Sequence, residues 1–128
     1  MAPRSLVIRH QPAFWHLDAA RGPSTPSFEA ANARHEHEWK IWKDIKLPAG
    51  KKILPGVVTH STNLIEHPEL VADRICRFAE AVGPENVIAS TDCGLGGRVH
   101  PQIAWAKLKA LSQGAELASK RLYAKAAA

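Results

Sequence analysis

Cysteine is scarce in this sequence, because its 128 residues include only Cys76 and Cys93. Two cysteines in a chain that opens without a secretory signal do not make a disulfide framework, so we expect a reducing, cytoplasmic setting. Long apolar runs are also missing, and none approaches the roughly 20 residues that a membrane-spanning helix requires. These absences predict a soluble protein with no membrane partner.

Concentrated charge of one sign is absent as well. The sequence has 17 Lys and Arg against 12 Asp and Glu, a formal net charge of +5, and the basic residues are spread along the chain. A dedicated nucleic-acid-binding protein usually gathers them on one stripe with a recognisable motif. We therefore expect a solvated surface and no nucleic-acid partner, with a basic binding module as a competing hypothesis.

What remains is the composition of an ordinary globular domain, with 45% hydrophobic and 23% charged residues. Residues 1–24 differ from the rest, because they contain Pro3, Pro12 and Pro23 and no apolar period that persists beyond one turn. We interpret residues 1–24 as a poorly ordered or non-native leader. Residues 25–128 are expected to form the folded part of the chain.

A regular alternation of strands and helices begins at Pro26. Short apolar runs predict strands at residues 27–31, 53–59 and 87–90, and helical patterns cover residues 34–45, 68–82 and 101–122. The loops after the strands start near Glu29, His60 and Thr91, which are 31 residues apart in each case. A βαβ crossover takes about 30 residues and produces a parallel sheet with helices packed on it. We predict an α/β fold whose three loops meet at the C-terminal edge of the sheet.

Two of the expected helices have an apolar face. Pro68 suits the first position of one helix and Gly83 its end, and the face between them consists of Val71, Ile75, Phe78 and Val82. The expected face of the last helix consists of Ala104, Leu108, Leu111, Ala115, Ala118 and Leu122. Cys76 lies beside the first face, and we interpret it as a packing residue.

The most informative residue for chemistry is a cysteine just past the third strand. Cys93 lies in a glycine-rich loop, Ser90-Thr91-Asp92-Cys93-Gly94-Leu95-Gly96-Gly97-Arg98. A thiolate at this place can bind Zn²⁺, and glycines let the backbone turn sharply and leave room for a ligand. The pattern by itself leaves open a buried, inert cysteine.

Two other ionisable residues end strands. Glu29 lies between Phe28 and Ala30, and a carboxylate among apolar neighbours is either partnered in a site or costly to bury, which makes it a candidate metal ligand. His60 follows the second strand and suits proton transfer near neutral pH, although a histidine hydrogen-bonded to its own loop fits the pattern equally.

His35 and His37 form a third histidine-containing segment together with their acidic neighbours. Side chains at i and i+2 of a helix point in different directions, so these two histidines do not make the i, i+4 pair of a zinc-protease helix. We interpret the segment as a solvated helix start.

Three segments resemble, in order and spacing, the end of the cobalamin-independent methionine synthase family. They are Ser27-Phe28-Glu29-Ala30-Ala31-Asn32, Gly56-Val57-Val58-Thr59-His60-Ser61 and Asp92-Cys93-Gly94-Leu95-Gly96-Gly97-Arg98. The resemblance runs from about Ser27 to Leu122, and the stretch at 34–39 is similar to the shorter relatives of that family. It implies that residues 25–128 are the C-terminal part of a (β/α)₈ TIM barrel, about its last three βα units.

The resemblance also implies a zinc site. The family holds its metal through a His-x-Cys pair, a Glu and a Cys at the C-terminal face of the barrel. Glu29 and Cys93 match the Glu and the last Cys, and His60 resembles the histidine that protonates the departing folate. The implied reaction moves a methyl group from a methyltetrahydrofolate-type donor, 5-methyltetrahydropteroyltriglutamate, to zinc-bound homocysteine and yields methionine.

The same resemblance sets limits on that reaction. Relatives use zinc-bound thiolates on other electrophiles, including an epoxide opened by coenzyme M, so another small thiol stays open. No cysteine precedes Cys76, so the His-x-Cys pair has no match, and three βα units are too few to close an eight-stranded barrel. We expect the chain to be inactive by itself, with two alternatives: a non-catalytic remnant, or a partner subunit that completes a barrel. The open edge of the sheet also predicts self-association.

Overall fold

The structure, a computed structural model, describes residues 25–127. Its elements along the chain are β1 (Ser27–Phe28), η1 (Glu36–Lys43), β2 (Leu54–Val58), α2 (Pro68–Val82), η2 (Pro84–Asn86), β3 (Ser90–Thr91) and α3 (Pro101–Ala127), where η marks a 3₁₀ helix. The predicted α/β class is confirmed. The leader expected at residues 1–24 lies outside the described residues.

The three strands form a small parallel sheet in the order β1-β2-β3. Ser27 pairs with Leu54, and Gly56 pairs with Ser90. The strands predicted at 27–31 and 87–90 are wrong in extent. β1 ends at Phe28 because the next N–H groups, at residues 30 and 31, donate to a side chain, while residue 87 makes only an isolated bridge before β3.

Helix α2 has the predicted bounds, and local chemistry explains both ends. Pro68 occupies the first turn, where its missing N–H costs nothing, and His67 Nδ1 accepts a hydrogen bond from the Glu69 N–H at 3.1 Å. Gly83 ends the helix with a φ of 97°, which is accessible to glycine and strained for other residues. The signals that set this helix are therefore all within a few residues of it.

The helix predicted at 34–45 is instead the shorter 3₁₀ helix η1. Asn32 Oδ1 accepts hydrogen bonds from the N–H groups of Arg34 and His35, at 3.0 and 3.2 Å, so the chain turns at this asparagine before the helix begins. Trp42 of η1 is buried and stacks on Phe28 with ring centroids 5.4 Å apart. η1 is thereby fastened to the end of β1.

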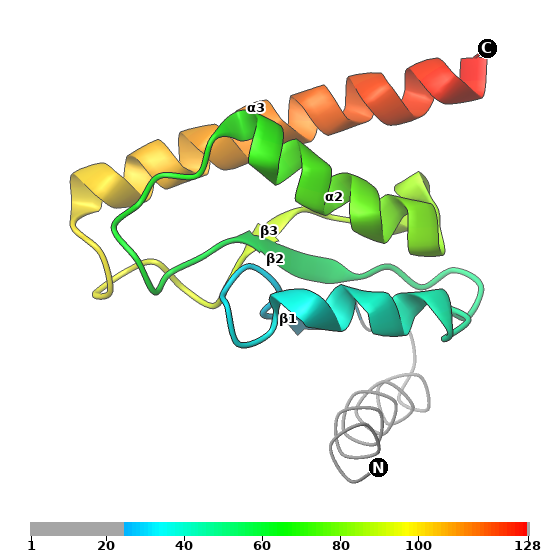
Figure 1. Ribbon diagram of the computed structural model, residues 1–128, viewed down its shortest axis with the longest axis horizontal. Coiled ribbons are helices and arrows are strands. Elements are labelled where there is room, and N and C mark those ends of the chain that lie inside the picture. Colours follow the sequence, from blue (N-terminus) through cyan, green and yellow to red (C-terminus); the bar gives the residue numbers. More distant parts are fainter. Residues whose placement is uncertain (1–24, 128) are drawn as a thin grey trace, which may run out of the picture.

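Helices α2 and α3 lie against each other, and both contact β2, as Figure 1 shows. One core cluster joins β2, α2 and α3 and has as its fully buried members Val57, Val58, Val71, Ala72, Ile75 and Ala118. A second cluster joins η1 to α2 and the start of β2, through Ala30, Trp42, Ile53 and Phe78. No helix within residues 25–127 is long and apolar enough to cross a bilayer.

The apolar face predicted for the last helix is confirmed in part, because Ala118 is buried and Leu111, Ala115 and Leu122 pack against the core cluster. The rest of the face needs a correction. Leu108 is 39% exposed, and the positions that are buried are Lys107, Ala110, Gly114 and Ala118. Gly114 explains the shift, because a Cβ built there would collide with Val71 and lie 3.0 Å from the Pro68 carbonyl oxygen. The close approach of α2 thus selects small residues along the face of α3.

A buried ion pair crosses the same part of the molecule. Lys107 of α3 is fully buried, and its Nζ lies 2.8 Å from Oε1 of the buried Glu66. Glu66 Oε2 also accepts a hydrogen bond from the Thr59 N–H at 2.6 Å. The loop after β2 is therefore held by α3 from one side and by its own carboxylate from the other.

Candidate metal centre

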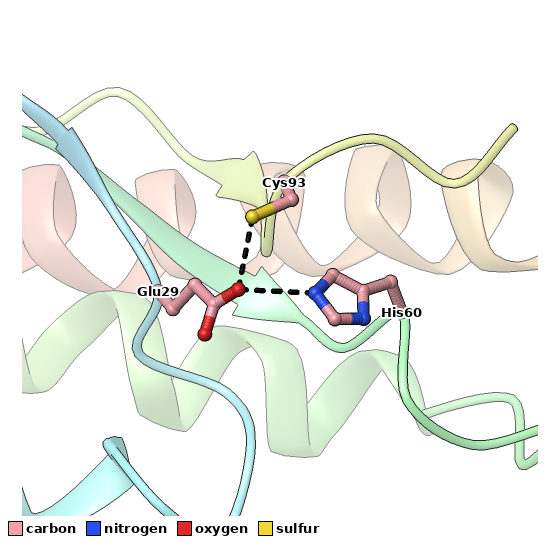
Figure 2. A group of neighbouring side chains, drawn as sticks. All are labelled: Glu29, His60 and Cys93. Carbon is pink, nitrogen blue, oxygen red and sulfur yellow. Dashed lines mark hydrogen bonds and ion pairs between the residues drawn. The ribbon is translucent and has the colours of Figure 1, made fainter. Parts of the chain in front are cut away.

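Glu29, His60 and Cys93 meet at the C-terminal ends of the three strands, as predicted from their equal spacing (Figure 2). Glu29 Oε1 lies 3.0 Å from His60 Nε2 and accepts a hydrogen bond from the Cys93 thiol at 2.9 Å. One ligand atom from each of the three residues lies within 4.8 Å of the others. Carboxylate oxygen, imidazole nitrogen and thiol sulfur are the donors that zinc takes in proteins.

The electrostatics of the cluster favour an ionised carboxylate beside a protonated thiol. Hydrogen bonds from Cys93 and then from His60 lower the pKa of Glu29 from 4.5 to about 2. The same bond to Glu29 raises the pKa of the Cys93 thiol. A metal ion at this place takes the thiol as thiolate and so displaces the shared proton, which is the usual linkage between metal binding and proton release.

The backbone at Cys93 adopts a strained conformation. Its φ of 48° lies in the left-handed region, and among the described residues no other non-glycine has a positive φ. Left-handed backbone in this loop therefore falls on the cysteine itself as well as on Gly97, whose φ is 74°. Strain of this kind costs about 1–3 kcal/mol and is found mostly at functional sites, where the surrounding structure maintains it.

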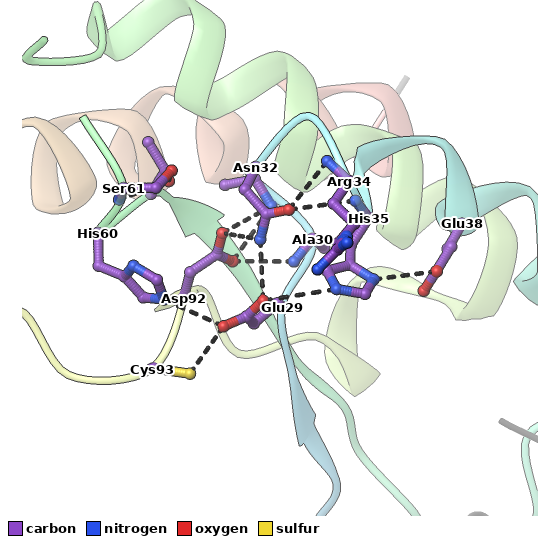
Figure 3. Close-up of polar contacts among 12 residues, drawn as sticks. Glu29, Ala30, Asn32, Arg34, His35, Glu38, His60, Ser61, Asp92 and Cys93 are labelled. Carbon is purple, nitrogen blue, oxygen red and sulfur yellow. Dashed lines mark hydrogen bonds and ion pairs between the residues drawn. The ribbon is translucent and has the colours of Figure 1, made fainter. Parts of the chain in front are cut away.

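A buried carboxylate next to Cys93 holds the Glu29 segment in place (Figure 3). Asp92 is fully buried, and its Oδ1 accepts hydrogen bonds from the N–H groups of Ala30 and Ala31, at 2.8 and 3.1 Å. Asp92 Oδ2 accepts one from Asn32 Nδ2 at 3.0 Å. These bonds join segments about 60 residues apart and bring β1 and β3 to the site together.

The position of Asp92 requires a glycine in the neighbouring strand. A Cβ built on Gly56 would overlap Asp92 Oδ1 and lie 2.8 Å from the Asp92 nitrogen. Real Cβ atoms do not approach a backbone that closely, so Gly56 is the residue that lets the buried carboxylate lie across β2. Gly56 of β2 is thus needed by the site.

The structure decides several alternatives that the sequence left open. His60 contacts Glu29 rather than its own loop, and its Nδ1 is buried without a hydrogen-bond partner. Cys93 is exposed and Cys76 is half-buried against the main core cluster, so Cys76 packs as expected. His37 is exposed, which fits a solvated helix start, whereas His35 is half-buried and its Nε2 lies 3.6 Å from Glu29 Oε2.

Sequence reasoning missed the residues that support the cluster, namely Asn32, His35 and Asp92. Asp92 stands beside the chosen cysteine and Asn32 three residues after the chosen glutamate, so their proximity in sequence was a usable signal. Their hydrogen-bond partners come from other βα units and could not be assigned from local pattern.

The fold and the cluster together define a parallel α/β unit with a metal-capable site at the ends of its strands. No protein-family model matches the chain, and no curated protein matches it. Among solved structures, the chain is similar to a B12-independent methionine synthase from Shewanella sp. W3-18-1 in complex with selenomethionine, with 29% sequence identity and a TM-score of 0.64 over 78% of this chain. The match spans 28% of that synthase chain.

Proposed function

We propose that this chain is part of a zinc-dependent methyltransferase of the cobalamin-independent methionine synthase type, with Glu29 and Cys93 as metal ligands. One observation carries the proposal: Glu29, His60 and Cys93 meet at the ends of three parallel strands in a chain whose fold is similar to a methionine synthase. In this proposal residues 25–128 are the C-terminal part of a (β/α)₈ barrel, and β1 to β3 are three of its eight strands.

The donor set fits zinc. Catalytic zinc sites combine nitrogen, sulfur and oxygen ligands and keep one position open for substrate. Cys93 is exposed and the Glu29 side chain is 30% exposed, so a small molecule can reach this place. Zinc bound here supplies a Lewis acid that holds a small thiol as its thiolate, the nucleophile of methyl transfer.

His60 is assigned to proton delivery rather than to the metal. A histidine that ligates a metal almost always donates its second ring N–H to an acceptor. His60 Nδ1 has no such partner, while its Nε2 lies beside Glu29. A proton held on Nε2 is available to the leaving nitrogen of a methyltetrahydrofolate-type donor, which must be protonated as the methyl group departs.

We propose homocysteine as the thiol substrate, because the similar synthase was solved with selenomethionine. Another small thiol, such as coenzyme M, is the alternative substrate for the same zinc chemistry. The two described cysteines are free, which fits a reducing compartment, and we place the protein in the cytoplasm.

A second candidate is a non-catalytic remnant or a partner subunit that completes a barrel. The chain spans 28% of the similar synthase. The chain supplies Glu29 and Cys93 but no counterpart of the family's His-x-Cys pair. We therefore expect the isolated chain to bind zinc weakly and to transfer no methyl group.

Zinc content and thiol protection test the site. Zinc titrated into the purified chain should slow the alkylation of Cys93 by iodoacetamide, and Glu29→Gln should weaken that protection. Cys76→Ser is the matched control and should leave protection of Cys93 unchanged. Zinc that protects neither thiol, or Cys76 labelling first in the folded chain, would contradict the assignment.

Complementation distinguishes the methyltransferase hypothesis from the second candidate. The upstream part of a full-length methionine synthase is added in trans, and zinc content and methionine formation are measured. Methionine formation that depends on both parts, and is lost in Cys93→Ser, supports a methyltransferase site. Tight stoichiometric zinc and turnover by the isolated chain would contradict the expected inactivity, and zinc binding without turnover in the mixture would favour the non-catalytic remnant.

A further inference from the structure

The two oxygens of Glu29 face different surroundings (Figure 3). Oε1 faces the cluster, where it contacts the Cys93 thiol and His60. Oε2 faces the segment that leads into η1, where Asn32 Nδ2 donates to it at 3.0 Å and His35 Nε2 lies 3.6 Å away. Each oxygen therefore has its own set of partners, and the carboxylate plane is fixed between the two sets.

Each partner of Oε2 is itself held by a carboxylate. Asn32 Nδ2 also donates to the buried Asp92, at 3.0 Å. His35 Nδ1 lies 3.0 Å from Glu38 Oε1, on the next turn of the chain. The imidazole ring of His35 is thus oriented by Glu38 so that its second nitrogen points to Glu29.

We infer that His35, oriented by Glu38, is a positioning residue that fixes Glu29 Oε2 and thereby presents Oε1 alone to the metal. This inference rests on the proposed function for the metal, but the geometry of the carboxylate stands without one. A ligating carboxylate is normally hydrogen-bonded by neighbouring groups, and loss of such a group typically lowers metal affinity 10- to 100-fold. His35 acts through Glu29 and touches neither substrate nor metal.

The neighbouring His37 provides a matched control. It has the same side chain, lies two residues further along in η1, of which His35 is the N-cap residue, and is exposed. Asparagine places its amide where Nδ1 of histidine lies, and glutamine places its amide where Nε2 lies. His35→Asn therefore keeps the contact to Glu38 and loses the one to Glu29, whereas His35→Gln keeps an amide within reach of Glu29.

The first measurement is metal affinity of the full chain, obtained with zinc and Co²⁺ by competition with a chelator. We expect His35→Asn to weaken the affinity about 10-fold, at the lower end of the range for such neighbours, because Asn32 still holds Oε2. His35→Gln should lie near wild type, and His37→Asn should equal wild type. The midpoint of urea unfolding, measured in parallel, should be the same for His35→Asn and His37→Asn.

The second measurement needs no metal. The rate at which iodoacetamide alkylates Cys93 is measured at one pH with a chelator present, and trypsin separates the two cysteines because Arg77 lies between them. Glu29→Gln defines the rate without the carboxylate. We expect His35→Asn to alkylate several-fold faster than His37→Asn, since a released Glu29 no longer holds the thiol proton.

The two measurements separate the two proposals. A chain that binds no metal refutes the zinc assignment, and the alkylation rates then decide the role of His35. Equal alkylation rates for His35→Asn and His37→Asn overturn the inference, as does equal metal affinity in a chain that binds metal. The inference is supported if His35→Asn is alkylated faster than wild type and binds metal more weakly, and if His35→Gln restores both values towards wild type.

Discussion

At the scale of single residues, Glu29 combines exposure with a strongly perturbed acidity. Its side chain is 30% exposed, so burial is not the main influence on its charge. The hydrogen bond from Cys93 is the largest cause of its low pKa, followed by the one from His60. The carboxylate is thus stabilised by two groups that come from other strands, and its acidity reports whether those strands are in place.

The first prediction is a pKa of about 2 for Glu29 in the folded chain. Because the folded value is below the unfolded value of 4.5, the stabilisation is complete above pH 4.5 and is lost as the pH falls towards 2. The ¹³C carboxyl shift of Glu29 should still report a carboxylate at about pH 3.5, where an ordinary Glu is mostly protonated. Cys93→Ala should raise the midpoint towards 4.5, and Cys76→Ala should not.

Some residues of the site could be predicted from the sequence, and others could not. Glu29, His60 and Cys93 were found because each directly follows a strand and the strands recur at equal spacing. Asp92 also follows a strand, but its role could not be predicted, because it accepts hydrogen bonds from the N–H groups of residues 30 and 31, which only the folded chain brings near. A periodicity shows where a loop lies, but not which side chain turns inward.

At the scale of elements, the close contact between β2 and Asp92 requires a glycine at position 56 of β2. Gly56→Ala should destabilise the chain by about 1–3 kcal/mol, because its Cβ forces apart a strand and a buried carboxylate. Gly96→Ala, in the loop after β3, is the control, since a Cβ there meets nothing within 4 Å. Urea unfolding measures both, and equal midpoints would contradict the packing described for Gly56.

The buried ion pair between α3 and the loop after β2 leads to a third prediction. Lys107→Met leaves Glu66 buried without its nearest cation, and breaking such a pair costs about 3–5 kcal/mol. Lys109→Met, on the exposed side of the same helix, should change stability by less than about 0.5 kcal/mol. The free energy of unfolding from urea titration compares them. A Lys107→Met chain as stable as Lys109→Met would show that the pair contributes little.

The elements differ in how far the sequence determined them. α2 was predicted to the residue, because Pro68, His67 and Gly83 set its ends locally. β1 and β3 were not, because a strand two residues long exists only through its partner, and its end depends on where the N–H groups go next. The α3 face was predicted in part: Ala118 and Leu111 pack in the core as expected, but the buried Lys107 and Gly114 were missed because they interrupt the apolar period.

At the scale of the whole molecule, the sheet has two edge strands within the described residues, β1 and β3. Several large apolar side chains are exposed, among them Ile88, which lies two residues before β3 and is 44% exposed, and Trp105, which is 73% exposed. Trp105 lines a groove of about 680 Å³ together with Thr91 of β3. Unpaired strand edges beside apolar surface are the usual route to association between chains.

The fourth prediction is concentration-dependent self-association through the β3 edge. Sedimentation velocity should show species larger than the monomer as concentration rises, and Ile88→Lys should reduce them because a charge beside the edge opposes strand pairing. Leu70→Lys, on an exposed position of α2, is the control and should associate like wild type. A monomer at every concentration would contradict the prediction, and equal effects of the two lysines would place the association elsewhere.

The hydrogen bonds from Ala30 and Ala31 to Asp92 also set an order of events during synthesis. Ala30, next to Glu29, leaves the ribosome first, and Asp92, which accepts its hydrogen bond, follows 62 residues later. At about 5–20 residues per second, that delay lasts about 3–12 s. The nascent loop has no fixed conformation to adopt in this interval, and Lys107 must still emerge to secure the loop of His60. A ribosome stalled before residue 92 should therefore carry a chain in which Glu29, His60 and Cys93 are not assembled, because the cluster forms only as the final helix is translated.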